Sequence, residues 1–159
     1  MNNDMDKRFM IRTLELAKEG MDQGHGGPFG CVIVKNGEII AEGNNSVLSE
    51  NDPTAHAEIV AIRQATKALG TFQLDGCELY TSCEPCPMCL GAIYWARPER
   101  VFYAATRNDA AKAGFDDEFI YNELNLDPAK RSIQMVNVGR EDALPAFRSW
   151  LNKENKRVY

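Results

Sequence analysis

The sequence of 159 residues lacks several features, and each absence excludes a class of protein. No run of chain approaches the roughly 18 apolar residues of a membrane span, so no membrane function is expected. The N-terminal residues are polar and acidic, unlike a secretory signal peptide, and a cytoplasmic protein is the expectation. Basic charge is not in excess, since 18 Lys and Arg against 23 Asp and Glu give a net charge of −5. Nucleic acid is therefore not the expected partner.

Histidine is also scarce, and linkers are missing. The two histidines are His25, in a glycine-rich turn where an exposed loop residue is expected, and His56. No internal repeat, linker or low-complexity segment divides the chain, and 44% apolar with 26% charged residues is a globular composition. Residues 1–159 are therefore expected to form a single domain.

The cysteines of this chain are clustered. Three of its five cysteines, Cys83, Cys86 and Cys89, recur at three-residue spacing. In a reducing compartment, such a cluster favours a metal site or catalysis over disulfides. Cys31 and Cys77 lie in apolar, strand-like runs, and we expect them to be small buried core residues.

Hydrophobic periodicity predicts alternating helices and strands. The expected helices cover residues 4–21, 56–69, 87–96, 106–112, 118–124 and 144–152, and the expected strands cover 29–34, 38–41, 77–81, 100–105 and 133–138. Asn36-Gly37 predicts a tight type I′ hairpin turn, and residues 43–53 a polar loop. Strands that alternate with helices favour parallel pairing, with the hairpin as an antiparallel edge. The predicted fold is α/β: a three-layer α-β-α sandwich around a five-stranded mixed sheet.

His56 and the pair Cys86 and Cys89 have the ligand chemistry of a zinc site. At the first turn of a helix, three-residue spacing places both sulfurs on one side, and the helix N-terminus favours thiolates. A catalytic zinc site uses three protein ligands and keeps a fourth position for a water that the metal makes acidic. Glu58, two residues after His56, is the candidate acid–base residue.

Cys83 and Glu58 each allow another interpretation. Cys83 could open an iron–sulfur motif, but that motif needs a further cysteine soon after Cys89, and residues 90–96 contain none. Cys83 could also close a structural zinc site with the other three ligands, which would leave Glu58 without a role. An acidic residue such as Glu58 in a first helical turn is also stabilised by the helix dipole alone.

The His56-x-Glu58 and Pro85-Cys86-x-x-Cys89 motifs are typical of zinc deaminases. Through them the chain resembles the cytidine-deaminase-like superfamily. Within this superfamily it is similar to the bacterial guanine deaminases over nearly its whole length, through residues 26–30, 51–58, 79–84, 92–98, 113–117 and the closing Tyr159.

The resemblance implies hydrolysis of guanine, a small-molecule purine, to xanthine and ammonia. It implies one Zn²⁺ per subunit on His56, Cys86 and Cys89, with Glu58 as proton shuttle for a zinc-bound hydroxide. The substrate contacts that it implies are Asn45, Phe29, Asp117, Trp95 and Tyr159, with Phe29 and His56 flanking the ring. Asp116 and Glu118 stay open as alternatives to Asp117. The resemblance also implies a homodimer in which the segment from about 140 to 159 is exchanged between subunits.

Three other functions stay open at this point. A deaminase of guanosine or of another small base or nucleoside would use the same zinc motif. A deaminase of adenosine in tRNA would share it too, although the net charge of −5 speaks against a nucleic-acid partner. A structural zinc-binding module would need no open coordination position.

Overall fold

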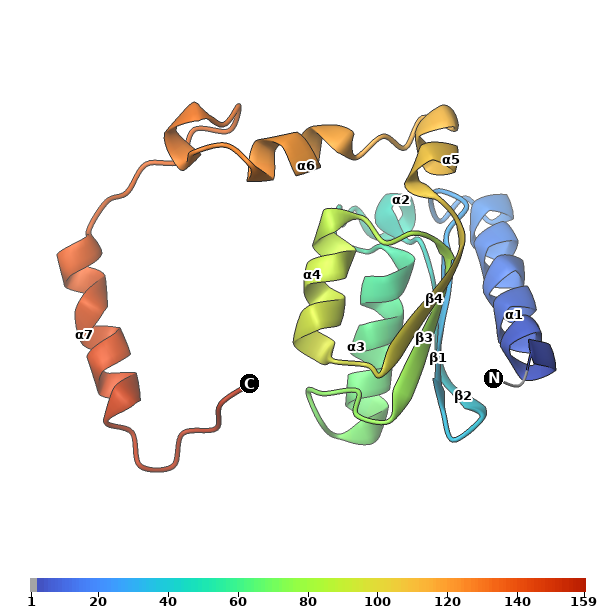
Figure 1. The fold of residues 1–159 in the computed structure, drawn as a ribbon, viewed down its shortest axis with the longest axis horizontal. Coiled ribbons are helices and arrows are strands. Elements are labelled where there is room, and N and C mark those ends of the chain that lie inside the picture. Colours follow the sequence, from blue (N-terminus) through green and yellow to red (C-terminus); the bar gives the residue numbers. More distant parts are fainter. Residues whose placement is uncertain (1–2) are drawn as a thin grey trace. The chain divides into compact units, whose positions relative to one another are not determined.

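The computed structural model describes residues 3–159, and residues 1 and 2 of the expected domain 1–159 lie outside the described part. The chain divides into two compact units, Met1–Asp117 and Glu118–Tyr159, and the single domain stays a prediction. The elements of the first unit are α1 (Asn3–Asp22), β1 (Gly30–Lys35), β2 (Glu38–Asn44), α2 (Val47–Glu50), α3 (Ala57–Leu69), β3 (Cys77–Cys83), α4 (Pro87–Ala96), β4 (Arg100–Ala105) and α5 (Arg107–Lys112) (Figure 1). No helix of the described residues has the length and apolar character needed to cross a bilayer.

Strands β1 and β2 form the predicted hairpin. Asn36 and Gly37 have positive φ angles of 51° and 79°, as a type I′ turn requires. The strand order is β2-β1-β3-β4; β1 pairs antiparallel with β2 and β3, and β3 pairs parallel with β4. The sheet is therefore mixed, with an antiparallel edge as expected.

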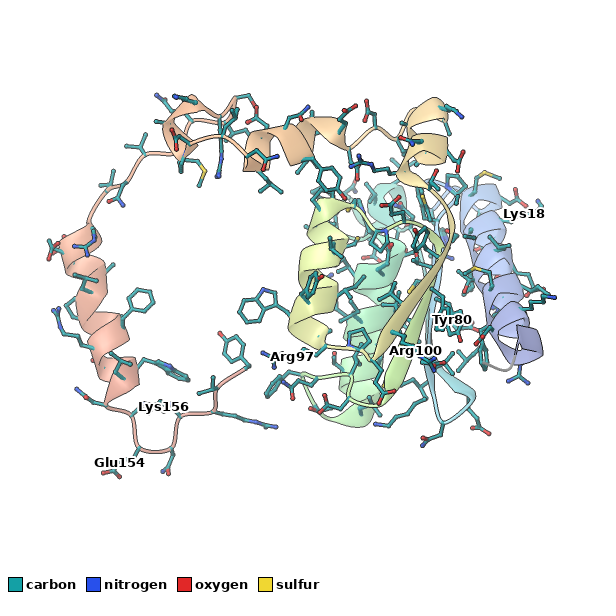
Figure 2. All side chains as sticks on the ribbon, in the orientation of Figure 1. Lys18, Tyr80, Arg97, Arg100, Glu154 and Lys156 are labelled. Carbon is teal, nitrogen blue, oxygen red and sulfur yellow. The ribbon has the colours of Figure 1, made fainter. Side chains whose placement is uncertain are left out.

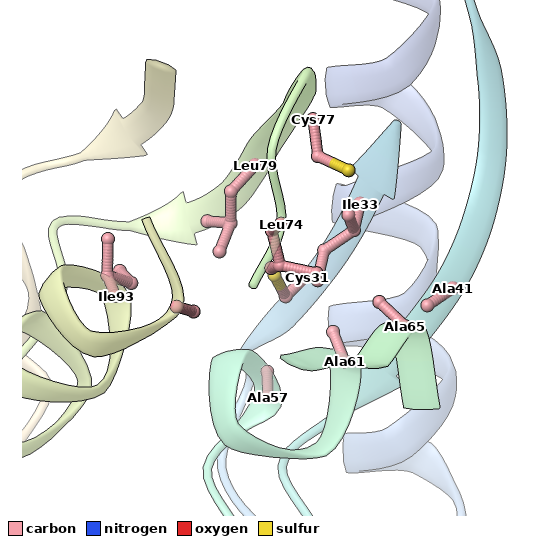
Figure 3. Packing of buried hydrophobic residues seen from close by; sticks show 11 residues of the cluster. Cys31, Ile33, Ala41, Ala57, Ala61, Ala65, Leu74, Cys77, Leu79 and Ile93 are labelled. Carbon is pink, nitrogen blue, oxygen red and sulfur yellow. The ribbon is translucent and has the colours of Figure 1, made fainter. Parts of the chain in front are cut away.

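Helices cover both faces of this sheet, which confirms the three layers (Figure 1). On one face, Phe9 and Leu16 of α1 pack with Val32, Val34 and Tyr80. Tyr80 also donates a hydrogen bond to Glu78, which Arg100 contacts from β4 (Figure 2). The opposite face carries α3 and α4, whose core cluster with β1, β2 and β3 includes Cys31, Ile33, Ala41, Ala57, Ala61, Ala65, Leu74, Cys77, Leu79 and Ile93 (Figure 3). Cys31 and Cys77 are thus buried core residues, as predicted.

Two glycines let the helices approach the sheet closely. A Cβ on Gly43 would lie 2.5 Å from the carbonyl oxygen of Ala57, and a Cβ on Gly30 would lie 2.2 Å from that of Thr13. The fully buried apolar residues of α3 are all small: Ala57, Ala61 and Ala65. This close packing fixes the start of α3 beside the strand ends.

The predicted five-stranded sheet is wrong in its strand count, because the sheet has four strands among the described residues. The expected strand at 133–138 is irregular chain. It lies in the unit Glu118–Tyr159, which holds α6 (Glu118–Leu124), the 3₁₀ turn Pro128–Lys130 and α7 (Arg140–Leu151) and offers no other strand for pairing. Ile133 and Val138 are 80% and 85% exposed. The β-branched residues of this segment therefore have neither a partner strand nor the burial that would stabilise a strand. The loop expected at 43–53 also contains the short helix α2.

Candidate active site

His56 and Glu58 come from the start of α3. His56 is the N-cap residue, with extended backbone angles, and Ala57 begins the helix. Because Glu58 is in the first turn, its carboxylate lies at the positive end of the helix dipole. The imidazole of His56 is half-buried, whereas Glu58 is only 6% exposed.

Cys86 and Cys89 come from the start of α4, in the same arrangement. Cys86 is the N-cap residue and Pro87 occupies the first turn, where a missing N–H is tolerated. The backbone N–H of Cys89 donates to Cys86 Sγ over 3.5 Å. The N-terminus of α4 therefore stabilises a thiolate at Cys86.

The two helix starts bring three ligand atoms together. Cys86 Sγ and Cys89 Sγ each lie 3.5 Å from Nδ1 of His56, and the three ligand atoms lie within 4.8 Å of one another. Tetrahedral zinc, with bonds of about 2.1 Å to nitrogen and 2.3 Å to sulfur, holds such atoms about 3.6 Å apart. One imidazole and two thiols at this separation fit zinc, which prefers nitrogen and sulfur ligands.

The three side chains of this cluster shift one another's pKa through their hydrogen bonds. The Cys89 thiol and His56 hydrogen-bond to Cys86 and lower the pKa of Cys86 to about 4. The same contact raises the pKa of Cys89, and hydrogen bonding to Cys86 raises the pKa of His56. A divalent cation among the three atoms would favour the deprotonated form of both thiols.

Glu58 adjoins the three ligand atoms without being one of them. Its Oε2 lies 3.4 Å from Cys89 Sγ, and its Oε1 accepts a hydrogen bond of 3.0 Å from the Thr81 hydroxyl. Burial raises the pKa of Glu58. A buried carboxylate next to a metal position is placed to take up and return protons there.

Cys83 does not join the ligand group. Its thiol donates to the carbonyl oxygen of Thr106 over 3.6 Å, and burial raises its pKa to about 11. The closed site with four protein ligands therefore does not form in this structure. The thiol instead ties the end of β3 to the start of α5.

Two of the predicted substrate contacts, Asn45 and Phe29, lie side by side. The backbone N–H of Asn45 donates to the carbonyl oxygen of Phe29, and Asn45 Oδ1 accepts from the N–H of Val47. The Phe29 ring meets Phe115 edge-on, with centroids 4.9 Å apart. Asp117 is close enough to Cys86 for their charges to interact, and burial is the main cause that raises its pKa.

Trp95 and Tyr159 are the two remaining residues that the resemblance implies as substrate contacts. Trp95 lies in the last turn of α4, nine residues or about 13 Å along the axis from Cys86. Its side chain is 63% exposed. Tyr159 ends the unit Glu118–Tyr159 and is 67% exposed.

Several contributors to the site have no assignment from the sequence. Thr81 hydrogen-bonds Glu58, and Glu84 accepts from the N–H of Arg107 and so positions α5. Gly26 has no room for a side chain, because a Cβ would lie 2.0 Å from Asn45 Oδ1. The sequence signal for Thr81 was a hydroxyl two positions after Leu79, on the face of β3 that packs against the core, where a buried polar group needs a partner.

Comparison with known proteins agrees with this geometry. The model of the cytidine and deoxycytidylate deaminase zinc-binding region matches residues 3–105. Guanine deaminase of Bacillus subtilis (strain 168) is 60% identical over 151 residues, 95% of this chain and 97% of that protein. An X-ray structure of guanine deaminase from Bacillus subtilis has a TM-score of 0.93 at 59% identity, covering 96% of this chain and 98% of that one. A tRNA-specific adenosine deaminase of Aquifex aeolicus (strain VF5) is 45% identical over 102 residues, 64% of this chain and 67% of that protein.

The match includes the elements that carry the ligand atoms. His56 is the N-cap residue of α3, Cys86 is the N-cap residue of α4, and both helices lie within residues 3–105. The length of this match, together with one nitrogen and two sulfurs at the spacing of zinc ligands, assigns the chain to a single family. The chain belongs to the family of cytidine and deoxycytidylate deaminase zinc-binding proteins.

Proposed function

We propose that this protein is a zinc-dependent aminohydrolase that converts guanine and water to xanthine and ammonia. The observation that supports guanine as the substrate is the extent of the likeness to a guanine deaminase. It covers 151 of 159 residues, so it continues into the unit Glu118–Tyr159. The Aquifex tRNA-specific adenosine deaminase matches 102 residues, and a net charge of −5 also suits a small purine better than tRNA.

In the proposed mechanism, His56, Cys86 and Cys89 hold the zinc ion. Bound zinc supplies Lewis-acid chemistry, which makes a coordinated water acidic near neutral pH. Glu58 takes one proton from the attacking water as the C2–O bond forms and passes it to a ring nitrogen. It then takes the second proton from the same oxygen and passes it to the amine, which leaves as ammonia when the C2–N bond breaks. The thiol ligands suit a reducing compartment, and with all five cysteines free we place the activity in the cytoplasm.

We propose that Asn45 and Asp117 recognise the edges of the base. Asn45 Oδ1 already accepts from Val47, so its amide offers N–H donors to a purine acceptor. Asp117 would accept from guanine N–H groups, with Asp116 and Glu118 as the alternatives. Phe29 and His56 would flank the flat ring, while Trp95 and Tyr159 would close the pocket.

We further propose that the active form is a homodimer with exchanged C-terminal segments. Helices α6 and α7 contain no buried residue, and Phe119, Phe147 and Val158 are each more than 60% exposed. A unit of this size does not hold a core of its own and needs another surface to cover its apolar side chains. Tyr94 and Trp95 of α4, 74% and 63% exposed, give a second copy an apolar surface to cover. Light scattering coupled to gel filtration checks this, and a monomer that is fully active would refute it.

The activity is tested by ammonia release from guanine, guanosine, cytosine, adenosine and a tRNA anticodon stem-loop. We expect release from guanine at a kcat/KM well above that for the other substrates. If kcat/KM is higher for guanosine or for the RNA than for guanine, that molecule is the substrate instead of guanine. Release from none of the five, by protein with one zinc per chain, would favour a structural zinc-binding module.

A further inference from the structure

The carboxylate of Glu58 is held from the sheet by a residue outside the metal cluster. Thr81 Oγ1 donates to Glu58 Oε1 over 3.0 Å, and both residues are buried, with 1% and 6% exposure. The other oxygen, Oε2, lies 3.4 Å from Cys89 Sγ. One oxygen of the carboxylate therefore faces the sheet and the other faces the ligand atoms.

Thr81 is well suited to hold a side chain in place. It lies in β3, an inner strand of the sheet, where it pairs with Cys31 on one side and Tyr103 on the other. Its side chain lies on the same face as that of Leu79, two residues earlier, which packs under α3 and α4. A β-branched residue has a restricted χ1 angle, so the hydroxyl position is fixed by a rigid backbone.

We infer that Thr81 is a positioning residue for the proposed deamination, and that its hydroxyl orients Glu58 so that Oε2 faces the reacting water. This inference rests on the proposed function. Thr81 holds Oε1, which leaves Oε2 facing the ligand atoms. A carboxylate that was free to rotate would spend part of its time away from the reacting position. Small errors in the placement of a reacting group lower turnover by up to about 100-fold.

The test compares Thr81→Val, which removes the hydroxyl at nearly constant shape, with Thr81→Ser, which keeps it. We expect Thr81→Val to bind one zinc per chain and to lose about 10- to 100-fold in kcat with little change in KM. Thr81→Ser should retain most of kcat. If Thr81→Val does not fold, as judged by thermal melting, Thr81→Ala replaces it as the variant without a hydroxyl.

Two results would overturn the inference: wild-type kcat in Thr81→Val, or an equal loss of kcat in Thr81→Ser and Thr81→Val. A crystal structure of zinc-loaded Thr81→Val gives a readout that does not depend on the substrate. There we expect the Glu58 carboxylate to be rotated, and an unchanged carboxylate would refute its positioning by Thr81. Failure of the proposed function is recognised separately, by the absence of ammonia release from guanine by the wild-type protein.

Discussion

Glu58 Oε2 and Cys89 Sγ lie 3.4 Å apart, although 31 positions separate the two residues in the chain. This contact joins the first turn of α3 to the first turn of α4. It places the proposed acid–base carboxylate beside a sulfur of the candidate zinc site, at the point where two helix N-termini meet.

Glu58→Gln should separate metal binding from catalysis. The amide keeps the size of the side chain but cannot take a proton from water. We expect one zinc per chain, as in the wild type, and a loss of about 100- to 10,000-fold in kcat. Metal analysis and ammonia release measure the two quantities. Loss of zinc in this variant would instead make Glu58 a ligand.

Removal of zinc should abolish activity and lower stability. A strong chelator should leave no measurable ammonia release and lower the melting temperature, because a ligand bound to the native state stabilises it. Zinc should restore both quantities, whereas magnesium should restore neither, since thiolates bind it poorly. Cys86→Ser should behave like the chelated protein. Full activity of a protein with less than a tenth of a zinc per chain would contradict this prediction.

Gly26→Ala should weaken substrate binding. The new Cβ would lie 2.0 Å from Asn45 Oδ1, so the Asn45 side chain must leave its contact with Val47. Loss of one hydrogen bond to the substrate costs about 1 kcal/mol, or roughly 5-fold in KM. Gly91→Ala is the matched control, because a Cβ there meets nothing within 4 Å. Steady-state kinetics in which both variants have the same KM would speak against this role of Gly26.

Removal of residues 153–159 should reduce guanine turnover while the fold persists. The buried residues of the described core lie between Phe9 and Ala96, so the truncation removes none of them. We expect an unchanged circular dichroism spectrum and a lower kcat/KM. Tyr159→Phe, with the ring kept and the hydroxyl removed, shows which part of the residue matters. Wild-type kinetics for the truncated protein would exclude the tail from the mechanism.

Glu42→Gln should lower stability at neutral pH but not in acid. Arg12 donates two hydrogen bonds of 2.9 Å to Glu42, which links α1 to β2 and lowers the pKa of Glu42. A carboxylate with a lowered native pKa stabilises the fold above its unfolded pKa of about 4.3, and this contribution is lost as pH falls through the native value.

Because this ion pair is partly exposed, we expect Glu42→Gln to lower the free energy of unfolding by about 0.5–1 kcal/mol at pH 7. At low pH the variant and the wild type should have the same stability. Urea unfolding at several pH values measures it. Glu38→Gln, on the same strand, controls for the loss of charge alone. A difference between Glu42→Gln and the wild type that does not change with pH would show that the ion pair is not its cause.

Local signals in the sequence were sufficient for most elements. Asn36-Gly37 predicted its turn, and the bounds expected for α4, β4 and α6 agree with the structure. The three ligands were also predictable, because imidazole and thiol groups at helix starts have few other uses at that spacing. In each case the deciding residues are within a few positions of one another, where chain geometry is fixed by the backbone.

Only the tertiary structure decided the contacts between distant segments. The expected fifth strand is absent because a strand needs a partner, and β propensity at 133–138 does not supply one. The sequence left two metal-binding roles open for Cys83, whereas in the structure its thiol donates to the carbonyl oxygen of Thr106 and lies outside the group of ligand atoms. The bond from Thr81 to Glu58 spans 23 positions and depends on how closely α3 lies on the sheet. Distances of this kind are set by the packing of side chains from many elements, which no short stretch of sequence contains.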